Sequence, residues 1–273
     1  MLHLRLSAIA VLLAVSTANA QAPSYDLPVD PSIPIITLNY VGGLTELPRQ
    51  NINPVLTIRA DGSVTVSDSL GRTKDIDTSI SSEDVQDLLR FSLKEQSFLD
   101  FNSGDTLQAI AAQNALCGRF MKVEEGATTV IHIRTADLDH EGRFNSLGVF
   151  AETYPGVKPL HELWAIEKKL NRFMEEVKAG GKDSVETAAE QATSFVKHQQ
   201  NPVTFKVEDL QRTVMTPDGR RMLEFKRDSE DGTTISVNVE YKADQPPQSP
   251  SITGELSRKL PTRPLMTCRS GND

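Results

Sequence analysis

The sequence lacks an excess of basic residues. Its 273 residues include 29 Lys and Arg but 37 Asp and Glu, which gives a formal net charge of −8. Proteins that bind nucleic acid through its phosphates usually carry a basic surface, so general nucleic-acid binding is not expected. The hydrophobic fraction is also low, at 38%. This value indicates that part of the chain is linker or tail rather than packed core.

The sequence also lacks an apolar run long enough to cross a membrane, which takes about 20 residues as a helix. The stretch from Leu6 to Val15 is much shorter, and it follows Arg5 and precedes Ala18-Asn19-Ala20. This layout is typical of a secretory signal peptide. We therefore predict that residues 1–20 are removed and that the mature chain starts at Gln21. The product should be soluble, in the periplasm or secreted, with no transmembrane anchor.

Cysteine is scarce, because only Cys117 and Cys268 occur. Export would place them in a compartment where a disulfide can persist. A Cys117–Cys268 bridge would tie the C-terminal tail to the first domain and stabilise the fold by about 4–5 kcal/mol in the loop-entropy model. The alternative is two unpaired thiols.

The common cofactor and catalytic signatures are missing. There is no Gly-x-Ser-x-Gly elbow, phosphate-binding loop, dinucleotide-binding glycine motif or Cys-x-x-Cys pair. His161-Glu162 begins like the zinc protease motif, but Ala165 stands where the second histidine is needed. We therefore expect no cofactor, and the interpretation leans against an enzyme.

A polar segment near the middle of the chain holds the remaining candidates for chemistry. A hydrolase would use His132 and His140 with Asp137 or Asp139, one imidazole acting as general base and a carboxylate orienting it. A metal site would use Asp137, Asp139, His140 and Glu141, whose oxygens suit calcium or magnesium. The structural alternative is a solvated acidic turn beside a half-exposed strand.

Composition and turn residues divide the chain into six segments. Gly180-Gly181 closes the best helical pattern, which begins at Pro159, and a segment poor in large apolar residues follows it. The predicted segments are a signal peptide (1–20), a Pro-rich leader (21–33), an α+β domain (34–180), a helical spacer (181–202), a small antiparallel β domain (203–243) and a Pro-rich C-terminal tail (244–273).

The order of strand and helix patterns predicts the fold class. Asp61-Gly62 lies between two alternating runs and is a strong hairpin signal. Ser81 to Asp84 supply a helix cap and first-turn acids. Strands are predicted over 35–40, 55–60, 63–67, 73–78, 128–135, 143–150, 203–207, 211–215, 220–225 and 234–241, and helices from 81, over 105–116 and from 159. We expect an α+β fold, in which an antiparallel sheet carries helices on one face.

The first part of this pattern supports a family resemblance. The run from Ile35 to Gly43, the Asp61-Gly62 hairpin, the capped helix and the aromatic end from Phe98 to Phe101 resemble exported bacterial proteins of unknown function over residues 35–102. The Gly-Gly strand end followed by a capped helix also resembles metalloprotease inhibitors associated with protealysin-like enzymes. That second resemblance implies a protein without catalytic groups of its own.

These observations favour a non-enzymatic binding or inhibitory module with an exported protein as its partner. A sheet-and-helix domain can present a strand edge or a loop to another protein, and the segment from Val41 to Asn53 is long for a hairpin loop. The alternative is a periplasmic hydrolase whose site is assembled from the scattered His and Asp residues.

Overall fold

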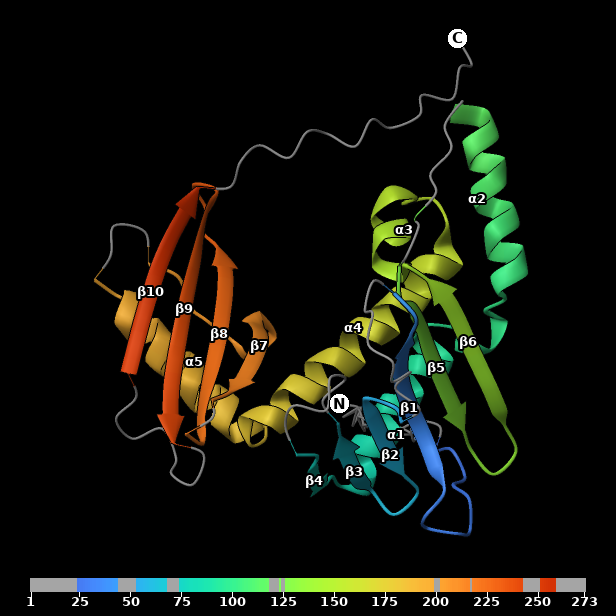
Figure 1. The fold of residues 1–273 in the computed structure, drawn as a ribbon, viewed down its shortest axis with the longest axis horizontal. Helices are drawn as coiled ribbons and strands as arrows, with labels where there is room; N and C mark the ends of the chain where they lie inside the picture. The colour runs from blue at the N-terminus through green and yellow to red at the C-terminus, as the bar shows by residue number, and fades with distance from the viewer. Residues whose placement is uncertain are drawn as a thin grey trace, which may run out of the picture.

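The computed structural model describes residues 24–43, 53–67, 74–117, 123, 126–198, 202–216, 218–242 and 251–258. They form two lobes, each an antiparallel sheet with helices on one side (Figure 1). The predicted α+β class is confirmed. Within these ranges, no helix combines the length and the apolar character that a membrane span requires.

The first lobe is built on a six-stranded sheet in the order β4-β3-β2-β1-β5-β6. The Asp61-Gly62 turn joins β2 and β3, as predicted, and Gly62 adopts the left-handed conformation that this turn needs. The strands are β1 (Pro34–Val41), β2 (Leu56–Arg59), β3 (Ser63–Val66), β4 (Ile76–Ser79), β5 (Thr128–Arg134) and β6 (Asp139–Asn145).

Alternation along these strands separates a core face from an outer polar face. Ile36, Leu38 and Ile131 are fully buried on the core face. Their strand neighbours Thr37 and His132 are opposite each other on the outer face, where both are half-buried. Most of the hydrophobic core of this lobe therefore lies on the side of Ile36, Leu38 and Ile131.

The helices of this lobe cover the core face. Helix α1 begins as predicted, because Ser81 caps the backbone N–H of Asp84 and the Asp84 carboxylate accepts from Ser81 in return. Helix α2 lies beside β6 (Figure 1), and its Ile110 is buried in the core of the lobe. The elements are α1 (Ser82–Arg90), a π-helical turn (Phe91–Glu95), a 3₁₀ turn (Phe98–Asp100), α2 (Ser103–Cys117), α3 (Leu147–Thr153) and α4 (Lys158–Ala179).

Helix α4 links the two lobes. Its buried residues from Leu160 to Val177 join the core of the first lobe, whereas Ala179 belongs to the core of the second. Its C-terminal half also holds edge strand β7, because the Thr213 hydroxyl donates to the Glu175 carbonyl at 3.0 Å and the Thr213 N–H donates to the Glu175 carboxylate.

The second lobe is a four-stranded sheet in the order β10-β9-β8-β7, covered by α5 (Lys182–Val196). Phe225, Val237 and Val239 are fully buried in the sheet beneath this helix. The remaining elements are a 3₁₀ turn (Val207–Asp209), β7 (Leu210–Met215), β8 (Arg220–Asp228), β9 (Thr233–Lys242) and β10 (Ser251–Arg258).

The structure corrects two predictions about the second lobe. The segment 181–202 is not a weakly packed spacer, because Val185, Ala188, Ala192 and Val196 of α5 are fully buried against the sheet. Small side chains let the helix approach the strands closely, so a face poor in large apolar residues still packs. The tail 244–273 contributes β10, which pairs with β9 along its whole length.

Two predicted strands are also wrong. The partner of β5 is Asp139–Asn145, and the apolar run that follows it forms helix α3 rather than continuing to residue 150. Residues 203–207 are not a strand; a 3₁₀ turn begins at Val207 and the first strand of the second sheet starts at Leu210. In the first case, β6 is an edge strand with charged residues on its outer face, and these hide the alternation of buried and exposed residues.

Candidate binding groove beside strand β4

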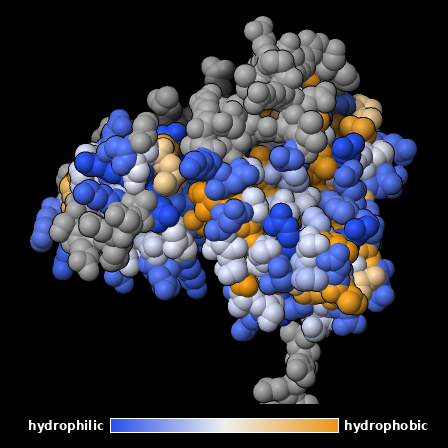
Figure 2. All heavy atoms as spheres, turned by 60° about the horizontal axis from the view of Figure 1, so that its bottom comes forward, coloured by the Kyte–Doolittle hydropathy of each residue, from blue (hydrophilic) through white to orange (hydrophobic). Residues whose placement is uncertain are grey.

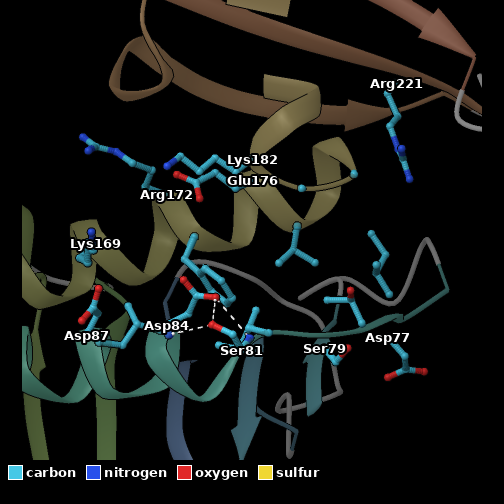
Figure 3. A pocket seen from close by; sticks show the side chains of 18 residues that line it. Asp77, Ser79, Ser81, Asp84, Asp87, Lys169, Arg172, Glu176, Lys182 and Arg221 are labelled. Carbon is cyan, nitrogen blue, oxygen red and sulfur yellow. Dashed lines mark hydrogen bonds between the residues drawn. The ribbon is translucent and has the colours of Figure 1, made fainter. Parts of the chain in front are cut away.

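A groove of about 640 Å³ lies beside β4, where the C-terminal half of α4 faces β4 and the beginning of α1. The turn from α4 to α5 and Arg221 of β8 complete its lining, so residues of both lobes contribute. Figure 3 shows α4 above the groove and the β4–α1 segment below it. We call this cavity the β4 groove.

The lower wall of the β4 groove is acidic. It carries Asp84 and Asp87 on α1, while the Asp77 carboxylate on β4 points away from α4 (Figure 3). Each of these carboxylates has a partner on its own side. Asp77 accepts from the Thr65 hydroxyl at 2.9 Å, Asp84 accepts from the Ser81 hydroxyl at 2.6 Å, and Asp87 pairs with Arg90 at 2.8 Å.

The upper wall is mainly basic. Lys169 and Arg172 lie on consecutive turns of α4, and Lys182 begins α5. The Lys169 ammonium lies 5.8 Å from the centre of the Phe91 ring, and Lys182 is 3.7 Å from Glu186. Among the residues that the structure describes, neither Lys169 nor Arg172 makes an ion pair. Lys169 and Arg172 are therefore cations of the groove that no described carboxylate neutralises in an ion pair.

Glu176 is the one acidic residue on the upper wall. Burial raises the pKa of its carboxyl group, and the positive charges of Lys169, Arg172 and Lys182 oppose that rise. Glu176 thus offsets part of the basic character of this wall without forming a close pair with any of the three.

The end of the groove is closed by the junction of the lobes. Gly180 has a φ of +95°, a conformation that glycine adopts without strain, and it ends α4. The Arg221 guanidinium packs where a side chain at position 180 would lie, and it donates to the Ala179 carbonyl at 3.4 Å. A larger residue at position 180 would therefore displace Arg221 from this end of the groove.

Apolar side chains form the deeper part of the groove. Leu88 and Val177 are buried, while Ile76, Ile80 and Phe173 are half-buried. An apolar base between charged walls suits an amphipathic ligand better than a fully hydrated ion. The lining includes neither histidine nor cysteine. Its residues can bind and orient a ligand, but they include neither of these usual bases and nucleophiles.

The predicted catalytic group assembles only in part. The His132 ring Nε2 lies 2.5 Å from Asp139 Oδ1, and the Arg134 guanidinium binds the other oxygen of the same carboxylate, with its Nε at 2.8 Å. These contacts lower the pKa of Asp139, with the hydrogen bond from His132 as the larger cause. The three side chains lie on the outer face of the first sheet, and Asp139 is exposed.

His140 does not join this group. It neighbours Asp139 on β6 and therefore points to the opposite face of the sheet, where its ring meets the Phe98 ring edge-on at 5.1 Å. Asp137 is exposed in the turn before β6. The predicted pairing of His132 with His140 in one hydrolase site is therefore wrong, because the sheet separates their rings.

The same alternation overturns the alternative metal site. Asp139 and Glu141 project from the outer face, whereas His140 faces the core. Nowhere in the described part of the chain do three or more His, Cys, Asp or Glu side chains gather to hold a metal ion. The predicted set of Asp137, Asp139, His140 and Glu141 does not converge.

Other sequence predictions lie outside the described residues. Most of the loop from Val41 to Asn53 falls there, as do Cys268 and the Cys117 side chain. The sequence does not indicate that the residues of the β4 groove form one site. The segments near 77, 170 and 221 are far apart in the sequence, and only folding brings them together. The strand predicted over 73–78 and the helices predicted from 81 and 159 correspond to parts of the groove lining.

The surface around the lobes is mixed. In the view of Figure 2, hydrophilic side chains predominate over the second lobe, at the left, and apolar side chains show between the lobes and on the first lobe.

A scan against protein-family models finds no match for the chain, and searches of curated proteins and of solved structures also find none.

Proposed function

We propose that this protein is an exported, non-enzymatic binding or inhibitory module that holds part of another exported protein in the β4 groove. The observation that carries the proposal is the convergence of Lys169 and Arg172, neither of which makes an ion pair with a described residue, on a groove with an apolar base. Cations without an ion partner favour association with a partner that carries the opposite charge.

A binding module and a hydrolase require different residues. A hydrolase needs a nucleophile or an activated water within reach of a base in a concave site. His132 and Asp139 contact each other on an open face of the sheet, outside the β4 groove. This contact alone does not favour catalysis.

Affinity capture with matched variants tests the groove. Immobilised mature protein should retain a partner from the exported fraction of the source cells, and the double variant Lys169→Glu/Arg172→Glu should lose it. A control variant, Lys158→Glu/Lys226→Glu, makes the same charge change at exposed sites outside the groove. Equal capture by both variants would refute the groove as the binding site, provided that circular dichroism shows both folded.

Activity assays test the non-enzymatic part of the proposal. The mature protein and its His132→Ala variant are compared on generic ester, peptide and phosphate substrates. We expect no turnover above the buffer rate. Turnover that disappears in the His132→Ala variant would establish a hydrolase and overturn the proposal.

A separate measurement tests export and signal-peptide cleavage. Cleavage after Ala20 removes Arg5, so the mature chain should start at Gln21 and carry a formal charge of −9. Intact mass and N-terminal sequencing of protein from the periplasm or medium test this directly. A chain that retains Met1 in that fraction would contradict signal-peptide removal.

A further inference from the structure

Strand β4 is one of the two outer strands of the first sheet. Among the described strands it pairs only with β3, with Thr65 opposite Asp77 and Ser63 opposite Ser79. It is short and mostly exposed, and four of its residues together with Ile80 line the β4 groove. The groove therefore runs along the side of β4 that no other described strand occupies.

The hydrogen bonds of β3 show which main-chain groups of β4 face the groove. Ile80 donates its N–H to the Gly62 carbonyl at 2.9 Å, so its main chain faces β3. Main-chain groups alternate in direction along a strand, so Thr78 and Ile76 also face β3. Asp77 and Ser79 consequently present their N–H and C=O groups to the open side.

The pairing on the far side of β3 agrees with this assignment. Ser67 donates its N–H to the Val55 carbonyl at 2.9 Å, which fixes the alternation between β2 and β3. Residues two apart on a strand direct their main-chain groups to the same side, so Thr65, like Ser67, directs its groups to β2, where Thr57 stands opposite. Asp77, which stands opposite Thr65, therefore has no main-chain partner on β3.

An added strand would place alternate side chains beneath α4. Residues i and i+2 of an extended chain point to the same face and lie about 6–7 Å apart. Lys169 and Arg172 are three residues apart on a helix, a spacing that brings their side chains together on one face. Two carboxylates on alternate residues of the added strand therefore match these two cations.

We infer that the β4 groove takes an extended segment of a partner protein as a seventh strand beside β4, with acidic residues at alternate positions facing Lys169 and Arg172. The inference rests on the proposed function and names the chemistry of the partner. Main-chain hydrogen bonds to Asp77 and Ser79 would supply affinity that does not depend on sequence, and the two cations would select acidic segments.

Synthetic peptides test both parts. The probe is fluorescein-labelled Ser-Val-Glu-Val-Glu-Val-Thr-Ser, and its binding to the mature protein is followed by fluorescence anisotropy. A second peptide carries Lys in place of both Glu residues. A third keeps the acidic sequence but has N-methyl groups on alternate peptide nitrogens, which remove donors and block strand pairing. We expect the second and third peptides to bind at least about tenfold more weakly than the first.

Variants of the protein complete the experiment. Lys169→Glu/Arg172→Glu should weaken the acidic peptide at least about tenfold, while Lys158→Glu/Lys226→Glu should leave its affinity unchanged. Ser79→Pro removes an N–H that faces the groove, not the one that pairs with β3, and should also weaken binding. The N-methylated peptide tests the same main-chain contact if the Ser79→Pro protein does not fold.

The outcomes separate this inference from the proposed function. Equal affinity for all three peptides, or no binding of the acidic peptide, overturns the added strand. If an exported partner is still captured in a Lys169- and Arg172-dependent way, the proposed function survives that result. Concentration-dependent dimers that Ser79→Pro abolishes would instead assign the β4 edge to a second copy of the chain and overturn the inference.

Discussion

The Glu167 carboxylate accepts a hydrogen bond from the Thr129 hydroxyl at 2.8 Å, in the buried contact between helix α4 and strand β5. Glu167 is only 8% exposed, and the Tyr40 hydroxyl also donates to it. The Asn171 amide donates in turn to the Tyr40 oxygen at 2.7 Å. A polar network thus lies inside the contact that positions α4 above the β4 groove.

This network makes the stability of the fold dependent on pH. Burial raises the pKa of Glu167, and the hydrogen bonds from Thr129 and Tyr40 only partly oppose it. Because its pKa is higher in the folded protein than in the unfolded chain, the stabilising contribution is complete below the unfolded pKa. It is lost as the pH rises through the folded pKa. Glu176 shifts in the same direction.

We therefore predict that Glu167→Gln increases the free energy of unfolding at pH 8, relative to wild type, and has a smaller effect at pH 4. The amide keeps an acceptor for Thr129 but has no charge to bury. Urea unfolding from pH 4 to pH 8 measures the difference, and Glu141→Gln is the exposed control. An equal effect of Glu167→Gln at both pH values would show that Glu167 does not titrate in this way.

A second prediction concerns the packing of β6. A Cβ atom at Gly142 would lie 2.8 Å from Phe98 Cε2 and 3.2 Å from Leu163 Cδ1. Phe98 and Leu163 are both almost fully buried, so neither side chain has free space to move into. We expect Gly142→Ala to reduce the free energy of unfolding by about 1–3 kcal/mol. Urea unfolding checks the change.

The neighbouring residue provides the control for that prediction. Arg143 lies on the exposed face of the same strand and pairs with Glu141 at 2.9 Å. Arg143→Ala should change stability by no more than about 0.5 kcal/mol. If Gly142→Ala is equally mild, then Phe98 and Leu163 are less tightly packed against β6 than the structure indicates.

Short-range signals in the sequence predict much of this fold. The Asp61-Gly62 turn requires a positive φ, and a Cβ at Gly62 would lie 2.5 Å from the Ile80 carbonyl oxygen, so glycine at this position has a structural reason. The Ser81 cap similarly fixes the start of α1 through its contact with Asp84. Such features depend on residues that are close in sequence or on one turn, and sequence patterns express them directly.

The remaining elements depend on contacts that the sequence does not display. Ser251 to Arg258 alternates like a strand, but nearby prolines favour a tail, and pairing with β9 decides the outcome. Helix α5 packs through alanines, which signal burial weakly. The β4 groove joins two walls separated by about ninety positions, and no local pattern encodes their approach.

A third prediction concerns the two cysteines, whose bond stays a prediction because Cys268 lies outside the described residues. Mass spectrometry of protein from the periplasm, without reduction, should find Cys117 linked to Cys268. Reduction should then lower the free energy of unfolding by up to about 4–5 kcal/mol. Two thiols that alkylate without reduction would contradict the bridge.

The last prediction addresses the junction of the lobes. The Tyr241 hydroxyl donates to the Ala179 carbonyl at 2.6 Å, at the buried end of α4. Tyr241→Phe removes this donor and leaves the carbonyl, among the described residues, with the longer contact from Arg221 at 3.4 Å. We expect a loss of about 1 kcal/mol in the free energy of unfolding. Amide hydrogen exchange should also become faster at Gly180 and Gly181, because the end of α4 is held less firmly.

Tyr25→Phe is the control, since Tyr25 is only half-buried and its hydroxyl makes no hydrogen bond to another described residue. If exchange at the two glycines is unchanged while stability falls, Tyr241 stabilises the second lobe without fixing the end of α4.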